Sequence, residues 1–410
     1  MKSDAAASIL VINCGSSSLK YRVLHMPEER ECASGEAVRV GTRTAAGSAI
    51  LHSVGGEKRT IPLPLPDHSA AFHAVISLLN EDAQRHPEVA YTCFAHRYVH
   101  PGTQYALTAQ IDEKMIERLK ASVNLAPIHN RISLQLIETC AREYRTVPQY
   151  AVFDTSFHRT IPPPFSSYAL PRSLVQKYHL RKIGFHGISH RFIMEESCRF
   201  LGRDPATQKI ISCHLGSGGS SVCALRNGES INTSMGFTPL EGLMMNTRCG
   251  DLDIGVLLNV MEKHRLSPQE AEEMLNRKSG ILGVFSSSSD MRDVVAQLGT
   301  DEKARAVFAM YVRRVRRYIG YYTLLLKKAD ILVFTDTLGI ELPLLRERIC
   351  EGLECFGIRL DTKRNMAADG YRNADLTGEG SETRVLAIPT NEEIMIARET
   401  FKEFCHDHRC

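Results

Sequence analysis

Short apolar runs separated by turns open the chain, and this pattern predicts β-strands. The apolar run at 9–12 leads into Asn13 and a Gly-Ser-Ser-Ser turn, after which a second strand begins. Strands and turns alternate in this way up to about residue 65. The segments that follow are predicted as a helix over 70–86, a strand over 89–99, an amphipathic helix over 112–124, a helix from about 129 and a strand over 150–153.

The pattern restarts after three consecutive prolines at 162–164. A strand, a Gly/Ser turn and a second strand are predicted between 209 and 225, so the opening unit of the chain recurs. We therefore expect two structurally related halves that face one another. The remaining segments are predicted as a hairpin turn at 227–228, a long helix over 300–328, strands over 330–335 and 385–389, and a helix from 391. This alternation predicts an α/β fold with mixed sheets, with a ligand between the halves where strand ends converge.

Composition narrows the class of protein. The chain has 410 residues with 43% apolar content, enough for two or three domains. A net charge of +3 gives no electrostatic case for binding nucleic acid or an anionic membrane. No apolar run reaches the roughly 20 residues that a membrane-spanning helix needs, and the N-terminus does not resemble a secretory signal. The 12 cysteines contain no C-x-x-C pair, which favours a cytoplasmic protein with free thiols.

The turn after Asn13 has the chemistry of a phosphate-holding β-hairpin. Gly15 lets the backbone approach a ligand, and the hydroxyls of Ser16 and Ser18 can bond anionic oxygens. Lys20 adds a positive charge. The segment lacks the Gly-Lys-Ser/Thr ending of a P-loop, and a strand rather than a helix follows it. Taken alone, the same residues also fit an ordinary serine-rich turn.

Polar residues recur at predicted strand and turn ends throughout the chain. They form, in order, V-I-N-x-G-S-S-S-L-K, H-R-x-V-H, L-A-P-x-H-N, F-D-T-x-F-H, G-F-H-G-x-S-H, H-L-G-x-G, T-S-M-G-F-T-P-L-E-G-L, T-R-x-G-D and P-T-N-E-E-x-x-I-A. Together these motifs resemble the acetate kinases, the acetokinase family, across nearly the whole chain. One such motif would be weak evidence, but nine in a fixed order are specific.

The resemblance implies the fold of the actin, sugar kinase and chaperone-ATPase superfold. It has two ribonuclease H-like domains with an inter-domain active-site cleft, and we expect them over 1–154 plus 392–410 and over 155–391, the latter with the phosphoryl-donor site. It also implies a homodimer. The implied reaction is reversible phosphoryl transfer onto acetate to give acetyl phosphate, dependent on Mg²⁺ or Mn²⁺.

The resemblance also assigns roles to residues at the acetate end of the site. Arg97 and Arg248 flank acetate and the migrating phosphoryl group, and His186 stabilises the transition state. Asp154 matches a residue usually given as proton donor or acceptor, although organising the metal and its waters fits better, because ionised acetate offers no proton to abstract. Asn13 and Glu392 match the metal positions. The acetate-binding residues are Arg97 and His129, with an apolar wall of Val99, Ile128, Phe185 and Pro239.

At the donor end the resemblance assigns a larger set. It comprises Ser16, Ser18, Lys20, His214, Leu215, Gly216, Ser217, Gly218, Asp290, Met291, Arg292, Asp336, Thr337, Leu338, Gly339 and Ile340.

Departures from the family pattern cluster at the donor end. The usual H-L-G-N-G has Ser217 in place of asparagine, and the usual adenosine loop F-T-G-G-I-G-E-N reads Phe-Thr-Asp-Thr-Leu-Gly-Ile-Glu over 334–341. Glycines beside a purine let backbone and base touch. Side chains at 336–338 are expected to project toward the adenine or ribose, and Asp336 adds negative charge. The pattern resembles the small pyrophosphate-using branch of the family, so the donor is pyrophosphate or, if the loop shifts outward, ATP.

Three other readings compete with this one. A relative that has lost catalysis and acts as a binding protein would explain the altered donor loop. A sugar kinase or chaperone ATPase would share the superfold but not the quoted motifs. A kinase for propionate or another short-chain acid differs by one methylene, worth only about 1–3 kcal/mol of discrimination. His158 and His190 also fit a structural role.

Overall fold

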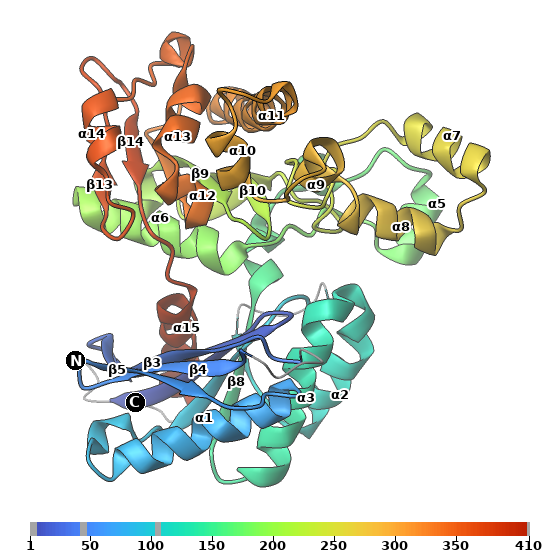
Figure 1. Cartoon of the computed structure of the whole chain (residues 1–410). Helices are drawn as coiled ribbons and strands as arrows, with labels where there is room; N and C mark the ends of the chain where they lie inside the picture. The colour runs from blue at the N-terminus through green and yellow to red at the C-terminus, as the bar shows by residue number, and fades with distance from the viewer. Residues whose placement is uncertain (1–5, 42–46, 103–107, 408–410) are drawn as a thin grey trace. The chain divides into compact units, whose positions relative to one another are not determined.

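The structure is a computed structural model that describes residues 6–41, 47–102 and 108–407, apart from the side chains of Pro127 and Ile128. The chain divides into two compact units (Figure 1). Unit 1 comprises Met1–Phe157 and Asn391–Cys410, and unit 2 comprises His158–Thr390. In the described ranges, no helix is long and apolar enough to cross a membrane.

Unit 1 is built on one sheet with the strand order β5-β4-β3-β2-β1-β6-β8-β7. β1 pairs antiparallel with β2 and parallel with β6, and β6 pairs parallel with β8. The strands are β1 (Ala7–Cys14), β2 (Ser18–Met26), β3 (Arg30–Val38), β4 (Ala49–Val54), β5 (Glu57–Pro62), β6 (Cys93–Tyr98), β7 (Thr108–Gln110) and β8 (Gln149–Phe153).

Unit 2 repeats this topology in the sheet β11-β10-β9-β12-β14-β13. β9 pairs antiparallel with β10 and parallel with β12, as β1 does with β2 and β6. The strands are β9 (Lys209–Leu215), β10 (Ser220–Arg226), β11 (Glu229–Thr233), β12 (Ile331–Thr335), β13 (Ala374–Asp375) and β14 (Arg384–Ala387). The prediction of two structurally related halves is therefore confirmed at the level of strand order.

Helices cover both faces of the unit 1 sheet. Leu10 and Ile12 of β1 share a core with Phe72 of α1 and Leu136 of α3, so these helices cover one face. α15 packs against β1, β2, β6 and β8 from the other face. The helices are α1 (His68–Ala83), η1 (Pro87–Val89), α2 (Glu113–Ser122), η2 (Val123–Leu125), α3 (Pro127–Glu143) and α15 (Glu392–Asp407), with η3 (Asp154–Thr160) at the boundary.

The unit 2 sheet separates an apolar layer from a polar one. Ile211, Cys213 and Leu215 of β9 pack in the core with α11, whereas the alternate residues Ser212 and His214 face α6. The helices are α4 (Pro163–Ser166), α5 (Arg172–Tyr178), α6 (Gly187–Leu201), η4 (Pro205–Thr207), α7 (Ile254–His264), α8 (Pro268–Arg277), α9 (Gly280–Phe285), α10 (Met291–Ala296), α11 (Glu302–Leu326), α12 (Asp336–Glu341), α13 (Pro343–Cys350), η5 (Glu354–Phe356) and α14 (Thr362–Ala367).

Two segments differ from the sequence prediction in ways that matter for the site. The strand predicted over 89–99 is shorter, because a 3-10 turn at Pro87–Val89 precedes β6. The segment 336–341, expected to be a ligand-facing loop, instead forms the short helix α12 at the end of β12.

Candidate active site

The β1–β2 hairpin has the predicted strand–turn–strand form. The Gly15 N–H donates to the carbonyl of Ser18 at 2.9 Å and closes the turn. Asn13 lies directly opposite Lys20 in the register, so the two side chains point to the same face of the sheet. Ser16 and Lys20 are exposed and Ser18 is half-buried. The turn therefore presents hydroxyls and an ammonium group beside Asn13.

Arg97 and Asp154 meet at the carboxyl ends of two neighbouring parallel strands, β6 and β8. Arg97 Nη2 donates to Asp154 Oδ2 at 3.0 Å, and its Nε lies 3.8 Å from Glu392 Oε2. Asp154 is only 1% exposed and Arg97 is partly exposed, so the carboxylate of the ion pair is buried. Burial lowers the pKa of Arg97, but the carboxylates of Glu392 and Asp154 outweigh burial and raise it above its usual value. Arg97 is therefore a permanently charged group in a fixed position.

The first turn of α15 brings two carboxylates to Asn13. Asn13 Nδ2 donates to Glu392 Oε2 at 3.3 Å and to Glu393 Oε1 at 3.0 Å. Amide and carboxylate oxygens are the ligands that Mg²⁺ prefers, so the residues present fit a magnesium site. The family resemblance assigned only Asn13 and Glu392 as metal ligands. It missed Glu393, which directly follows Glu392 in the motif P-T-N-E-E and could have been found there. Acidic residues here also complement the helix dipole.

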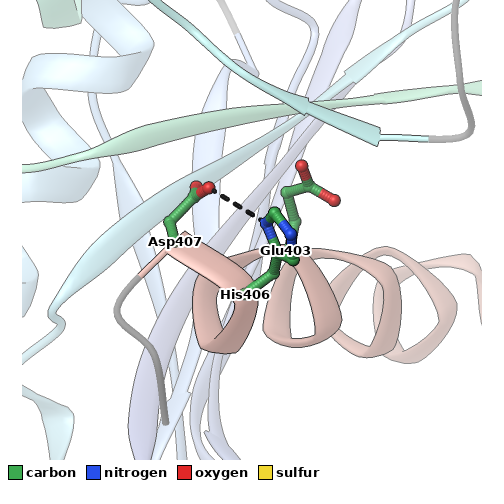
Figure 2. A group of neighbouring side chains, drawn as sticks. All are labelled: Glu403, His406 and Asp407. Carbon is green, nitrogen blue, oxygen red and sulfur yellow. Dashed lines mark ion pairs between the residues drawn. The ribbon is translucent and has the colours of Figure 1, made fainter.

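A separate group of possible metal ligands lies at the other end of α15 (Figure 2). Ligand atoms of Glu403, His406 and Asp407 all lie within 4.8 Å of one another. About 22 Å of helix separates Asp407 from Glu392, at 1.5 Å per residue. The His406 side chain is 84% exposed and lies 3.7 Å from Asp407, which also accepts a bond from Tyr150. This surface group is therefore distinct from the predicted metal pair.

In unit 2 the rings of His186 and His214 stack at a centroid distance of 4.1 Å, with planes 27° apart. His186 precedes α6 with a φ of 58°, so the helix begins immediately after a left-handed residue. Ser221 Oγ lies 2.9 Å from His186 Nδ1 and 2.8 Å from His190 Nε2. Since Ser221 has one proton, it donates to one of these nitrogens and accepts from the other. The protonation of His186 and the tautomer of His190 are therefore linked.

His158 and His190 support this pair from within the fold. His190 is fully buried, and burial, with His158 and His214 nearby, lowers its pKa well below the usual value. Its Nδ1 bonds Ser212 Oγ at 2.9 Å. His158 bonds Ser230 Oγ at 2.8 Å and the carbonyl of Phe185 at 3.0 Å. Both rings are buried and hydrogen-bonded at both nitrogens, as the structural reading predicts.

The glycine turn between β9 and β10 lies against two nitrogen groups. A Cβ placed on Gly219 would be 3.3 Å from His186 Nε2 and 3.5 Å from Arg248 Nη1, so these atoms converge on a position without a side chain. Burial lowers the pKa of Arg248 below its usual value. Among the described residues, no carboxylate is paired with Arg248. The turn, His186 and Arg248 thus form a surface suited to an anion.

The start of α12 contacts the same glycine turn. Asp336 Oδ2 lies 2.9 Å from His214 Nε2, and Thr337 Oγ1 accepts from the Ser217 N–H at 2.8 Å. Leu338 does not project toward a ligand as expected. It is 1% exposed and packs in the unit 2 core, because α12 turns this apolar side chain inward.

The other predicted donor residues fall into three groups. The side chains of Leu215 and Met291 are fully buried in the core, so only their backbone can reach a ligand. Arg292 is held by Asp290 and, at 3.1 Å, by Glu341. Gly216 and Gly339 are buried, Ser217 and Ile340 are half-buried, and Gly218 is exposed.

The predicted acetate-binding residues are divided between the units. Unit 1 holds Val99, which is buried, and His129, which is half-buried in α3; the Ile128 side chain lies outside the described residues. Unit 2 holds Phe185, which is buried, and Pro239, which is half-buried. The apolar wall of Val99, Ile128, Phe185 and Pro239 and the acetate-binding role of His129 remain predictions.

Glu241, which the sequence analysis did not assign, fixes the segment that carries Pro239. Tyr168 donates to Glu241 Oε2 at 2.7 Å and accepts from the Phe237 N–H at 2.7 Å. Lys182 Nζ donates to Glu241 Oε1 at 2.6 Å.

Comparisons with known proteins agree with this structure. The sequence profile of the Acetokinase family matches residues 8–398. The chain is 42% identical over 401 residues to the acetate kinase of Dictyoglomus turgidum, covering 96% of this chain and 97% of that one. The crystal structure of Porphyromonas gingivalis acetate kinase has a TM-score of 0.87 at 35% identity, covering 97% of this chain and 99% of that one. A propionate kinase from Francisella tularensis has a TM-score of 0.87 at 32% identity, covering 96% and 98%.

These matches span both units and the motifs from which the resemblance was inferred. The predicted fold class is confirmed: an α/β protein with two ribonuclease H-like sheets of the actin, sugar kinase and chaperone-ATPase superfold. The chain belongs to the acetokinase family.

Proposed function

We propose that this chain is an acetate kinase, which transfers a phosphoryl group reversibly between acetate and a phosphoryl donor. The observation that carries the proposal is the convergence of His186 Nε2 and Arg248 Nη1 on Gly219. Arg248 is half-buried, and no carboxylate of the described ranges neutralises it, so its charge is available to a phosphoryl group. The acetate kinase relatives support this choice of substrate.

The residues of the chain bind and orient two anions rather than move a proton. Acetate is ionised at pH 7 and attacks through its carboxylate oxygen, so the reaction needs no general base. Arg97 and Arg248 hold the carboxylate and the migrating phosphoryl group, and His186 donates to a phosphoryl oxygen in the transition state. Asp154 keeps the Arg97 guanidinium in one orientation through their 3.0 Å bond. Each donor of this kind typically supplies about 3–4 kcal/mol in the transition state.

Asn13 and Glu392, with Glu393 beside them, would hold Mg²⁺ or Mn²⁺ through amide and carboxylate oxygens. An ion held there would supply positive charge to offset the negative charge of the phosphoryl donor. Lys20, directly opposite Asn13 in the hairpin, adds a positive charge at the same place. Ser16 and Ser18 supply hydroxyl donors beside it.

For the donor we propose pyrophosphate rather than ATP. Asp336 and Thr337 contact His214 and Ser217 at the glycine turn between β9 and β10. At positions 336 and 337 the family usually has glycines, which would leave room beside adenosine. An outward shift of α12 is opposed by Arg346, which is fully buried and donates to the carbonyls of Gly339 and Ile340 at 2.9 and 2.7 Å. Moving the helix would leave a buried guanidinium without these acceptors, at a cost of several kcal/mol.

Propionate is the closest alternative substrate. The similarity to a propionate kinase favours it, and one methylene changes binding by only about 1–3 kcal/mol. A ratio of kcat/KM for acetate over propionate above unity supports acetate, and a ratio below unity favours the alternative.

We also propose that the protein is a homodimer that uses α7. This helix is apolar, and none of its residues is buried; Ile254 is 71% and Leu258 61% exposed. Figure 1 shows α7 beyond α8, away from the unit 2 sheet. A second copy of the chain would remove this apolar surface from water.

The proposed reaction is tested by acetyl phosphate consumption with Mg²⁺ and either inorganic phosphate or ADP. Consumption with phosphate but not ADP is the predicted result. Comparable rates with ADP would instead identify an ATP-dependent acetate kinase. No consumption with either acceptor would favour the catalytically silent binding protein. Arg248→Gln is the matched control, because it should lower any turnover that belongs to this site by about a hundredfold or more.

A further inference from the structure

We propose that Asp336 is a positioning residue of the phosphoryl-transfer site, which fixes His214 and, through the ring stack, His186. Asp336 stands where the usual adenosine loop of the family has glycine, and glycine has no side chain that could make this contact. The inference rests on the proposed function, because it explains how the histidine of that site is oriented.

The Asp336 carboxylate pairs with the buried imidazole of His214. Asp336 Oδ2 lies 2.9 Å from His214 Nε2, and the His214 side chain is only 6% exposed. An ionised carboxylate is an acceptor only, so His214 Nε2 carries the proton and donates it to Asp336. Water competes weakly for a bond at so buried a ring, and the carboxylate therefore determines which nitrogen of His214 is protonated.

The other nitrogen of the His214 ring, Nδ1, is also hydrogen-bonded. Ser189 Oγ lies 2.9 Å from His214 Nδ1 and 2.9 Å from Thr390 Oγ1. In the neutral form of His214 with the proton on Nε2, Nδ1 accepts from Ser189, and Ser189 in turn accepts from Thr390. The His214 ring is thus held at both nitrogens. Ser189 is fully buried, so this Ser-His-Asp arrangement cannot present a nucleophile to a substrate.

The His214 ring also contacts His186. The two rings stack at 4.1 Å, and Ser221 bonds His186 Nδ1 at 2.9 Å. One face and one nitrogen of His186 are therefore held, and its Cε1–Nε2 edge faces Gly219, with both atoms 3.3 Å from the position of a Cβ there. A shift of the His214 ring would move the surface against which His186 packs.

The backbone shows that Asp336 is held in place rather than free to turn away. Its φ is 62°, a conformation that glycine adopts freely and aspartate tolerates better than most residues. A Cβ on Gly216 would lie 2.2 Å from Asp336 Oδ2, so the carboxylate occupies the space that this glycine leaves open. The Thr337 N–H also donates to Asp336 Oδ1 at 2.6 Å.

Two variants remove the carboxylate in different ways. Asp336→Asn keeps the shape and the acceptor for the Thr337 N–H, and Asp336→Gly restores the residue that best tolerates the φ of 62°, so neither should unfold the protein. The matched control is Asp301→Asn at the start of α11, where Asp301 Oδ1 accepts from the Lys303 N–H at 2.7 Å and asparagine caps equally well.

The first readout is the rate of acetyl phosphate consumption with inorganic phosphate and Mg²⁺. We expect both Asp336 variants to lower kcat roughly tenfold with the KM for acetyl phosphate within about twofold, since a misplaced donor affects the transition state. The second readout is the imidazole ¹H–¹⁵N spectrum, with signals assigned by His186→Asn and His214→Asn. The signals of both rings should move in the Asp336 variants and stay unchanged in Asp301→Asn.

The outcomes separate the positioning role from its alternatives. His186 signals that do not move would overturn the proposal, whether or not kcat falls, since Asp336 would then act on the donor directly or not at all. A rise in KM with a fall in kcat, without spectral change, would identify such direct contact. If the unaltered protein transfers phosphate to no acceptor, the proposed function fails, and the spectra still decide whether Asp336 fixes the two rings.

Discussion

Arg97 and Arg248 have similar proposed roles but different surroundings, so replacing them should separate activity from stability. Arg97 is paired with Asp154, a carboxylate that is 1% exposed. Arg97→Ala would remove the guanidinium that faces this buried carboxylate, and removing one partner of a buried ion pair typically costs about 3–5 kcal/mol. For a unit of this size, that loss corresponds to a fall in Tm of roughly 10 °C.

Arg248→Ala should behave differently. Burial lowers the pKa of its guanidinium, which has no carboxylate partner among the described residues. Removing the guanidinium therefore leaves no buried carboxylate without its cation. Its Tm should therefore fall by less than that of Arg97→Ala, because no buried carboxylate loses its cation. Its kcat should nevertheless fall roughly 10²–10³-fold, as expected when one donor to a developing anion is removed.

Thermal unfolding and trapping of acetyl phosphate with hydroxylamine measure the two effects on the same samples. Adding Asp154→Asn to Arg97→Ala should recover part of the lost stability, because a neutral amide needs no cation, and should recover no activity. An Arg97→Ala protein as stable as the unaltered one, or an Arg248→Ala protein equally destabilised, would refute this account of the two arginines.

The remaining predictions concern other parts of the chain. Gly216→Ala should lower turnover, since the new Cβ would lie 2.2 Å from Asp336 Oδ2. Adding Asp336→Gly should recover only part of the lost turnover, because the same Cβ would also lie 2.7 Å from the Gly219 carbonyl oxygen. Burial lowers the pKa of His96 in the folded protein to about 4, below its unfolded value of 6.5. The free energy of unfolding should therefore fall as the pH drops from 6.5 to 4, by up to about 3 kcal/mol. Urea unfolding across this range should show a shallower fall for His96→Gln, and an unchanged slope would contradict the assignment. Leu258→Glu should shift the protein from dimer to monomer in sedimentation, and an unchanged dimer would exclude α7 as the contact.

The sequence predicted the parts of the site that depend on strand order. Arg97 and Asp154 each end an apolar run, and the ends of neighbouring parallel strands meet at one edge of a sheet. The recurrence of strand, Gly/Ser turn and strand likewise predicted the common topology of the two units. These features follow from local patterns and motif order, which a sequence displays directly.

The sequence could not predict the contacts of α12. A departure from a glycine pattern shows that side chains are present at 336–338, but not where they point. Their directions depend on the left-handed φ of Asp336 and on the short helix that follows, which turns Leu338 into the core and Asp336 toward His214. The role of Glu241 was missed for a similar reason, because Tyr168 and Lys182 are distant from it in the sequence.

The most direct test of the central claim follows the acetate oxygens. The protein is incubated with Mg²⁺, pyrophosphate or ATP, and acetate labelled with ¹⁸O in its carboxylate. The acetyl phosphate formed is then cleaved with hydroxylamine, and the released phosphate is examined by ³¹P NMR. Direct attack of the carboxylate predicts phosphate that carries one ¹⁸O, formed by the unaltered protein and lost in Arg248→Ala. Absence of labelled phosphate with both donors would contradict phosphoryl transfer to acetate at this site.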